Sequence, residues 1–312
     1  MIKNMIDKER PLIDMKVFPD SETVREIINI FAQRYDFLSV TSIGETVLGK
    51  SIYMVDIGSH EAETEVFYVG SHHGTEWITT LVLLRFINEY CEYYKNSSVA
   101  FGINIRKLFQ NRCIHIVPCL NADGVDIHLN GVDEKCVLYD RLIKMSNGDF
   151  SKWQSNARGV DLNHNYNAGF YEYKLLESTK GIEAGPTRYS GVAPESESEV
   201  GAVANYLRFN EKIKAVITLH SQGETIYYTS DGKCPDGSYA VAKQMELLTG
   251  YSLDEPKGLS SYGGLTDWYI KEIGKPSFTV ECGLGENPLP LSDFYKIYSD
   301  LRRMLFSFPL LI

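Results

Sequence analysis

Three residues of this chain have the types and the spacing of a zinc site. His73 and Glu76 lie three positions apart, so that one helical turn presents both side chains on the same side. His220 lies far along the chain and would complete a set of two histidines and one glutamate. Such a set fills three positions of a tetrahedral zinc and leaves the fourth for water. Zinc lowers the pKa of that water to about 7 and polarises a carbonyl group, which is the chemistry of a metal-dependent hydrolase.

A hydrolase of this kind also needs a carboxylate that takes the water's proton and passes it to the leaving amine. Glu281 is the best placed candidate, because it closes an uncharged strand-like run. Each signal is weak alone, since an HxxE pair arises by chance and Glu281 could be half of a buried ion pair. The joint pattern favours a catalytic site. The other histidines outside the motifs are interpreted as neighbours of the ligands or as surface or core residues: His60, His72, His115 and His128.

The predicted strands place His73, His220 and Glu281 where they can meet. Each residue follows a short apolar run that is typical of a buried strand, and these runs are 65–70, 215–219 and 277–280. In open α/β sheets, ligands bind outside the carboxyl ends of the strands. Side chains that are far apart in the sequence can therefore converge on one crevice.

Strands and helices alternate along the whole chain. Further strand-like runs cover 37–40, 51–57 and 113–117, and apolar spacing predicts helices at 21–31, 77–94, 238–248 and 291–308, with one more after Pro194. Residues 121–191 are rich in Asn, Gly, Asp and Tyr and show little periodicity, which predicts an assembly of active-site loops. No linker or repeat is evident. We therefore expect one α/β domain over residues 1–312, with residues 1–18 as an N-terminal extension.

Composition and net charge restrict the classes of molecule that this protein is expected to bind. The formal net charge of -10, from 41 acidic and 31 basic residues, argues against nucleic acid or an anionic membrane as a partner. The first ten residues lack the apolar run of a secretory signal, and no stretch approaches the roughly 20 apolar residues of a membrane span. The six cysteines are scattered without a metal-binding clip, which predicts reduced thiols and a cytoplasmic location.

Several blocks of the sequence resemble motifs of the zinc metallocarboxypeptidases, the carboxypeptidase A-like peptidases. In family order they are 70–77 (GSHHGTEW), 159–166 (GVDLNHNY), 218–221 (TLHS), 263–268 (GGLTDW) and 277–281 (SFTVE). The resemblance covers about residues 50–310. It implies a mixed, roughly eight-stranded sheet flanked by helices, one zinc per chain and a peptide substrate. It also assigns Asp161 as the carboxylate that orients His73, a role that zinc-binding histidines generally need filled.

The departures from the family pattern concern substrate binding. The family holds the substrate's terminal carboxylate with an Asn-Arg pair, which reads Asn163-His164 here. The family's oxyanion-polarising Arg falls on Gln154, and Arg158 is a candidate substitute. Its mobile substrate-binding Tyr falls on Leu259, with Tyr262 close by. A bidentate arginine clamp on a terminal carboxylate is therefore not expected, which disfavours an ordinary C-terminal carboxypeptidase.

One branch of the family matches further blocks. Residues 153–163 (WQSNARGVDLN), 189–197 (YSGVAPESE) and 285–291 (GENPLPL) are similar to signatures of the γ-D-glutamyl-meso-diaminopimelate peptidases. This resemblance implies hydrolysis of the γ-D-glutamyl–meso-diaminopimelate amide in cell-wall peptides, with a muropeptide as the substrate. His164 would be a weak, pH-dependent anchor, and Arg158, Arg188 and Tyr262 would grip diaminopimelate. Two alternatives stay open, a conventional metallocarboxypeptidase and an inactive peptide-binding module on the same fold.

Overall fold

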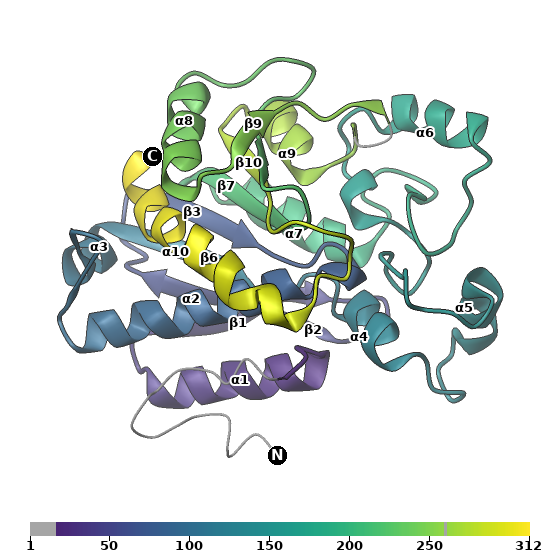
Figure 1. Cartoon of the computed structure of the whole chain (residues 1–312), viewed down its shortest axis with the longest axis horizontal. Coiled ribbons are helices and arrows are strands. Elements are labelled where there is room, and N and C mark those ends of the chain that lie inside the picture. Colours follow the sequence, from purple (N-terminus) through teal and green to yellow (C-terminus); the bar gives the residue numbers. More distant parts are fainter. Residues whose placement is uncertain (1–16, 259–260) are drawn as a thin grey trace.

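A mixed eight-stranded sheet forms the centre of the computed structural model, which describes residues 17–258 and 261–312. Its strand order is β1-β2-β6-β3-β7-β10-β8-β9 (Figure 1). The strands are β1 (Ser39–Glu45), β2 (Ser51–Gly58), β3 (Thr64–Val69), β6 (Arg112–Val117), β7 (Ile213–His220), β8 (Thr225–Tyr227), β9 (Ser252–Asp254) and β10 (Ser277–Glu281). A separate two-stranded hairpin pairs β4 (Val99–Ala100) with β5 (Ile103–Asn104).

Ten α-helices accompany the sheet in the described part of the chain. They are α1 (Ser21–Arg34), α2 (Ile78–Lys95), α3 (Ile105–Asn111), α4 (Ala122–Asn130), α5 (Tyr139–Ser146), α6 (Phe170–Thr179), α7 (Ser198–Phe209), α8 (Ser238–Thr249), α9 (Leu265–Trp268) and α10 (Phe294–Leu311). Shorter turns are η2 (Gly74–Glu76), η3 (Leu162–His164), η5 (Tyr269–Ile273) and η6 (Leu291–Asp293).

The four middle strands position the site. β6, β3, β7 and β10 pair in parallel, whereas β2 and β8 pair antiparallel to the outer members of this group. Because parallel strands point the same way, β3, β7 and β10 end at the same edge of the sheet. The segments that follow β3, and the last residues of β7 and β10, therefore lie next to one another.

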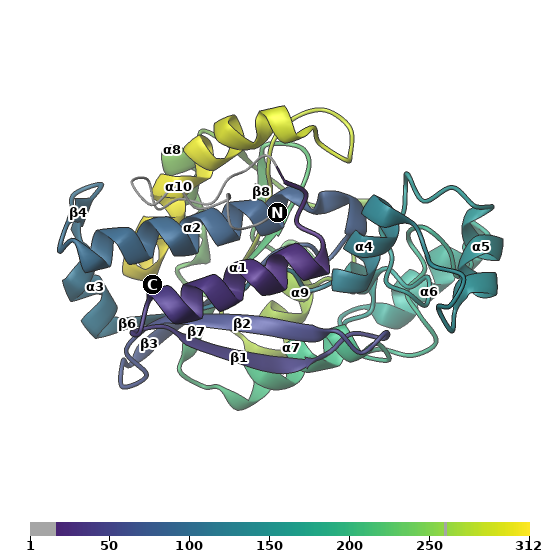
Figure 2. The same ribbon diagram turned by 90° about the horizontal axis from the view of Figure 1, so that it is seen from below.

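Alternation along the strands divides the core between two faces. On β3, Val66 and Tyr68 pack with α1, α2, α8 and α10, whereas Phe67 and Val69 pack with α7 and α9. Figure 2 shows α1, α2 and α10 on one side of the sheet and α7 on the other. Strands buried on both faces are continuous apolar runs rather than alternating ones, as the sequence of β3 shows.

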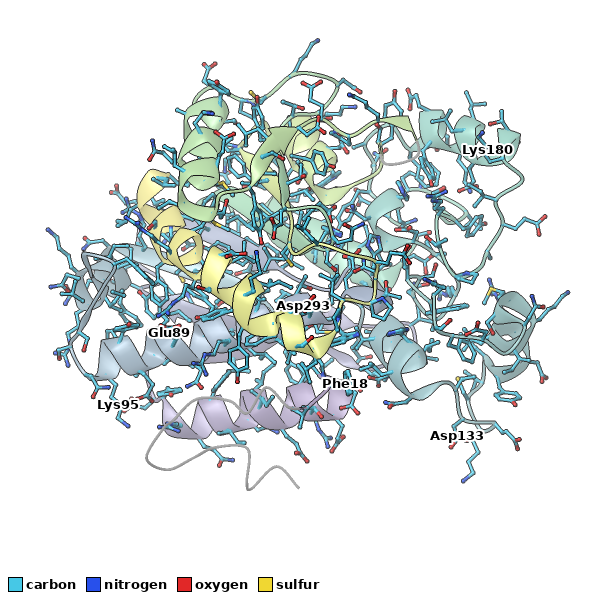
Figure 3. All side chains as sticks on the ribbon, viewed as in Figure 1. Phe18, Glu89, Lys95, Asp133, Lys180 and Asp293 are labelled. Carbon is cyan, nitrogen blue, oxygen red and sulfur yellow. The ribbon has the colours of Figure 1, made fainter. Side chains whose placement is uncertain are left out.

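One buried carboxylate inside this packing has two partners. Glu89 of α2 lies between α2 and α10 (Figure 3), where Tyr298 donates a hydrogen bond to its carboxylate and Arg302 forms an ion pair with it. Both partners belong to α10, so this group ties the two long helices together. A buried carboxylate is stable only with such partners.

The α/β class and the mixed eight-stranded sheet are confirmed, but some predicted elements were wrong. Residues 121–191, expected to be loops, contain α4, α5 and α6. Asn121 caps α4 by accepting a hydrogen bond from the Gly124 backbone, a local contact that apolar periodicity does not reveal. The strand expected at 37–40 begins at Ser39 and continues to Glu45, and the three-residue strands β8 and β9 were not predicted.

The ends of the chain leave two expectations untested. Residues 1–16, most of the expected N-terminal extension, lie outside the described residues, and the extent of the domain stays a prediction. Within residues 17–258 and 261–312, none of the helices combines the length and the apolar character needed to cross a membrane.

Candidate metal centre and substrate pocket

The structure brings His73, Glu76 and His220 together. Nδ1 of His73 lies 2.8 Å from Oε1 of Glu76, and Nδ1 of His220 lies 2.9 Å from Oε2 of the same carboxylate. One potential ligand atom from each residue lies within 4.8 Å of the others. Glu76 and His220 are buried, and His73 is partly accessible. Two imidazoles and a carboxylate grouped in this way are a donor set that suits zinc.

The turn that carries two of these residues is held by close backbone packing. His73 precedes η2, which contains Gly74 and Glu76. The backbone N–H of Gly74 donates to the carbonyl oxygen of Gln154 (2.8 Å). A Cβ atom at Gly74 would lie 2.3 Å from the carbonyl oxygen of Gly124 and 2.7 Å from that of Trp153. Only glycine permits this approach, which packs the loop around Gln154 directly against the ligand turn.

A second carboxylate orients His73 from its other side. Oδ1 of Asp161 lies 3.0 Å from Nε2 of His73, and Oδ2 accepts a hydrogen bond from the Arg188 backbone (3.0 Å). Burial alone would raise the pKa of the Asp161 carboxyl, but His73 lowers it below its ordinary value. The Asp161 carboxylate is therefore an anion in contact with the imidazole of His73, at the place that the family resemblance implies.

The charges within the group are mutually dependent. Burial would raise the pKa of Glu76, but His73 and His220 lower it to about 2. Nε2 of His220 is buried and has no hydrogen-bond partner among the described residues. A buried imidazole nitrogen without a partner costs free energy unless it binds something. This nitrogen and the ionised Glu76 both fit a site that holds a cation.

His72, the neighbour of His73, is a packing residue. It is fully buried, its Nε2 lies 3.1 Å from the Tyr166 hydroxyl, and its Nδ1 lies 3.3 Å from the Thr218 hydroxyl. Its ring stacks on His220 at a centroid distance of 5.2 Å. Burial lowers the pKa of His72 well below its ordinary value, so the ring is neutral. It supports the position of His220.

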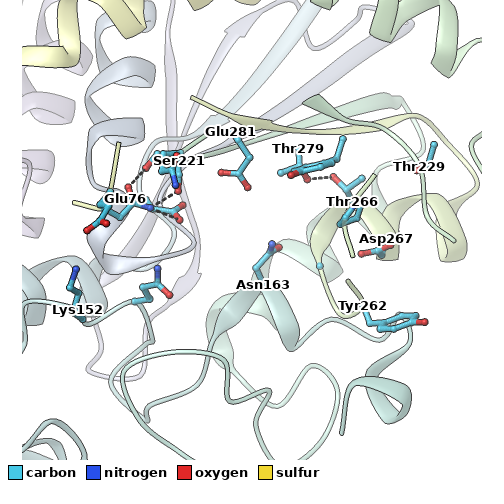
Figure 4. A pocket seen from close by; sticks show the side chains of 17 residues that line it. Glu76, Lys152, Asn163, Ser221, Thr229, Tyr262, Thr266, Asp267, Thr279 and Glu281 are labelled. Carbon is cyan, nitrogen blue, oxygen red and sulfur yellow. Dashed lines mark hydrogen bonds between the residues drawn. The ribbon is translucent and has the colours of Figure 1, made fainter. Parts of the chain in front are cut away.

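Glu281 stands beside this group at the end of β10. It is paired with His220 in the parallel β10–β7 ladder. Burial and the carboxylate of Glu76 raise the pKa of Glu281 well above its ordinary value. Its side chain lines the same pocket as Glu76, and Figure 4 shows it pointing into the space between Glu76 and Thr279. A carboxylate with a raised pKa in such a place is suited to proton transfer.

The pocket is a cavity of about 500 Å³. Of the three candidate metal ligands His73, Glu76 and His220, here called the metal group, Glu76 lines it. Gln154 is among the lining residues, and Figure 4 shows Lys152 on the Glu76 side of Glu281, with Thr266, Asp267 and Tyr262 at the opposite end. Most of the lining side chains are polar, and four are carboxylates: Glu76, Asp267, Glu281 and Glu286. Such a lining suits a polar, charged peptide better than an apolar side chain.

The four residues expected to bind substrate divide into two pairs. Asn163 and Tyr262 line the pocket, whereas Arg158 and His164 do not. The guanidinium of Arg158 lies 3.6 Å from the Glu197 carboxylate. His164 donates from Nδ1 to the carbonyl oxygen of Tyr262 (2.9 Å) and stacks on Tyr173.

Arg188, also expected to grip the substrate, is not among the lining residues either. Its backbone N–H bonds to Asp161, and its backbone carbonyl accepts a hydrogen bond from the Tyr173 hydroxyl (2.8 Å). Leu259 lies outside the described residues.

Lys152 and Asn287 are among the pocket residues to which the sequence analysis gave no role. Lys152 precedes Trp153 in a stretch without periodicity, and its position follows from the packing at Gly74. Asn287 donates from Nδ2 to Oε1 of Glu76 (3.4 Å) and accepts a hydrogen bond from the Ser221 hydroxyl (2.8 Å). The block at 285–291 had marked Asn287 as part of a signature, but without a role.

Comparisons with known proteins find a matching family model and two relatives. A family model described as zinc carboxypeptidase matches residues 24–301. The chain is 34% identical over 286 residues to an uncharacterized protein of Bacillus subtilis (strain 168), YqgT, covering 91% of this chain and 75% of that protein. It is also 34% identical over 269 residues to gamma-D-glutamyl-L-diamino acid endopeptidase 1 of Lysinibacillus sphaericus, covering 85% of this chain and 66% of that protein.

A solved structure shares the fold. A chain in the complex of bovine thrombin-activatable fibrinolysis inhibitor with tick carboxypeptidase inhibitor aligns with a TM-score of 0.71 and 22% identity, covering 95% of this chain and 97% of that chain. At this level of identity the match shows the arrangement of the sheet and helices and nothing about substrate.

Proposed function

Because this chain belongs to the zinc carboxypeptidase family, we propose that it hydrolyses the amide between γ-D-glutamate and meso-diaminopimelate in bacterial cell-wall peptides. Membership of the family makes the chain a zinc-dependent hydrolase of peptide bonds. The choice of bond rests on the relative from Lysinibacillus sphaericus, which is named for a γ-D-glutamyl-L-diamino acid linkage and is 34% identical.

In this proposal His73, Glu76 and His220 hold the zinc, and Asp161 fixes the ring of His73. A zinc ion in that position supplies a Lewis acid that polarises the scissile carbonyl and lowers the pKa of a water molecule to about 7. Glu281 accepts the water's proton and delivers it to the leaving amine, because its carboxylate faces the pocket beside Glu76. The pairing of Glu281 with His220 on adjacent strands is the observation that carries this assignment.

The lining of the pocket supports a wall peptide over a conventional carboxypeptidase substrate. A planar arginine fork is the side chain best suited to clamp a terminal carboxylate. No arginine lines the cavity among the residues that the structure describes. Asn163, Tyr262 and the hydroxyl groups of Thr266 and Thr279 are available instead, and they suit a residue with several polar groups such as diaminopimelate.

A comparison of two substrates tests the proposal. The values of kcat/KM are measured for L-Ala-γ-D-Glu-meso-diaminopimelate and for a blocked L-dipeptide with an aromatic C-terminal residue. We expect strong preference for the wall tripeptide. Preference for the blocked dipeptide would establish the conventional carboxypeptidase, and tight binding of the tripeptide without turnover by the zinc-loaded protein would establish a binding module.

We also propose a cytoplasmic location, in which the substrates are peptides released from the wall. All six cysteines are free thiols, and four of them are buried, which suits a reducing compartment. Fractionation of cells that produce the protein tests this location, and recovery in the external medium would contradict it.

A further inference from the structure

We propose that Lys152 recognises the γ-linkage itself, by binding the α-carboxylate that a γ-linked glutamate leaves free beside the scissile amide. This inference rests on the proposed function and adds a specificity-determining residue to it. Lys152 lines the pocket, is exposed to solvent and lies on the same side of Glu281 as Glu76 in Figure 4. It is placed to contact the substrate rather than to take part in proton transfer.

The chemistry of the linkage creates the need for such a residue. In an ordinary peptide the α-carboxyl group of a glutamate is consumed in the amide bond. In a γ-linked peptide the side-chain carboxyl forms the amide, and the α-carboxylate remains as an anion close to the reacting carbonyl. Besides the proposed zinc ligand Glu76 and the proposed base Glu281, the pocket carries the carboxylates of Asp267 and Glu286, which would repel this anion unless a cation meets it.

Lys152 is the single lysine or arginine that lines the cavity within the described part of the chain. Across residues 17–258 and 261–312, no acidic group forms an ion pair with it within 4.0 Å, and the acidic group whose pKa it helps to lower is the exposed Asp149, after the hydrogen bonds from Ser151. Its ammonium group is therefore available to a ligand. An ammonium on a flexible stem can meet a carboxylate at low structural cost, because it needs no fixed geometry.

The backbone of Lys152 is nevertheless fixed relative to the metal group. Trp153, the next residue, is fully buried. Gln154 donates its backbone N–H to Pro186 (2.8 Å) and accepts a hydrogen bond from Gly74 of the ligand turn (2.8 Å). The lysine is thus anchored within two residues of a direct contact to the turn between His73 and Glu76. Its side chain extends from a rigid base toward solvent.

Two charged groups of the substrate, the glutamyl α-carboxylate and the free amino group of the diamino acid, favour one orientation across the site. Figure 4 places Lys152 on the Glu76 side of Glu281, and Asp267 with Tyr262 at the opposite end. With the glutamyl residue at the Lys152 end, its α-carboxylate meets a cation, and the one free amino group of the diamino acid, which also carries two carboxylates, can meet Asp267. The reverse orientation would place the carboxylate against Asp267 and the amino group against Lys152.

A pair of matched substrates tests the role of Lys152. One is L-Ala-γ-D-Glu-meso-diaminopimelate, and the other carries D-isoglutamine, in which the α-carboxylate is a neutral carboxamide of the same size. We expect the zinc-loaded wild-type enzyme to prefer the acid about tenfold in kcat/KM, mainly through KM, as one charge-assisted contact would give. This preference should shrink as salt is added, because the pair is exposed.

The variants make the assignment specific. Lys152→Met should lower kcat/KM for the acid to the level of the amide and leave the amide unchanged. Lys152→Arg should restore the preference, because it restores the charge. Lys144→Met removes an exposed lysine of the same region outside the pocket and should change neither substrate.

Two results would overturn the role of Lys152 while leaving the proposed function intact. One is equal cleavage of both peptides by the wild-type enzyme, and the other is a Lys152→Met variant that loses activity equally on both. Failure of the wild-type enzyme to cleave either peptide would instead refute the proposed function, and the assignment of Lys152 with it.

Discussion

Glu281 and His220 are register partners on the adjacent parallel strands β10 and β7. Neighbouring strands lie about 4.8 Å apart, so the ladder itself sets the separation between the proposed base and a proposed ligand. Both residues are the last of their strands. The rigid sheet, rather than a mobile loop, therefore fixes this part of the site, which is the arrangement that catalysis by preorganised groups needs.

The proposed ligand set predicts the metal content of single variants. Wild-type protein should carry one zinc per chain, and His73→Ala, Glu76→Ala and His220→Ala should each lose most of it, because two ligands rarely retain the ion. His60→Asn is the control, since this exposed histidine lies outside the ligand group and the variant should keep its zinc. Elemental analysis that finds full zinc in any of the three alanine variants would reject that ligand.

The proposed base predicts a separation of zinc binding from turnover. Glu281→Gln keeps the size of the side chain and removes its ability to accept a proton, so zinc and fold should be retained while kcat falls about 10²–10⁴-fold. Glu286→Gln alters an exposed carboxylate of the same pocket and should stay near wild-type kcat. If Glu281→Gln turned over substrate almost as fast as the wild type, another group would be the base.

The contact between Asp161 and His73 predicts an effect on zinc affinity. Asp161→Asn keeps the shape but loses the negative charge 3.0 Å from the ring of His73, and zinc should bind about 10–100-fold more weakly. Competition with a chelator of known affinity measures this change, and thermal unfolding of the zinc-free protein checks that the fold survives. An unchanged dissociation constant for zinc would show that Asp161 does not act through His73.

Another buried histidine, His115, predicts how the free energy of unfolding depends on pH. His115 lies between Asp56 (2.7 Å) and Glu65 (2.9 Å). Burial would lower the pKa of His115, but the hydrogen bond to Asp56 and the neighbouring groups raise it from 6.5 to about 10. A folded-state pKa above the unfolded value gives stability that is complete below pH 6.5 and is lost as the pH rises to about 10.

His115→Gln removes the titrating group and tests this dependence. The free energy of unfolding of the wild type should fall more steeply between pH 6.5 and about 10 than that of the variant. Denaturant unfolding at a series of pH values, with zinc content held constant, measures both slopes. Parallel slopes would mean that His115 does not carry its charge in the folded protein.

The sequence predicted the positions of the proposed metal ligands and base better than it predicted the residues that line the pocket. The structure brings His73, Glu76, His220 and Glu281 together, as expected, because His73, His220 and Glu281 follow buried strands whose ends must meet, and Glu76 lies one turn after His73. The fold class followed from the same alternation of strands and helices. Both predictions rest on local sequence patterns, the apolar runs of strands and the alternation of strands and helices, which imply that the ends of the parallel strands lie together.

Which residues line the substrate pocket depends on tertiary contacts that no local sequence pattern encodes. His164 belongs to a motif, but its ring turns onto Tyr173 and the backbone of Tyr262 instead of lining the cavity. Lys152 lines the cavity because the backbone around Trp153 packs on Gly74, which lies far earlier in the sequence. Side-chain direction and close backbone packing therefore limited the prediction.

The bond that is cleaved tests the central claim most directly. L-Ala-γ-D-Glu-meso-diaminopimelate is digested in water enriched in ¹⁸O, and the products are identified by mass. Attack on the γ-carbonyl of the glutamyl residue should give unlabelled meso-diaminopimelate and an L-Ala-D-Glu dipeptide that carries one ¹⁸O in its new carboxylate. Release of free L-alanine with the label, or an intact tripeptide after incubation with the zinc-loaded enzyme, would contradict the account.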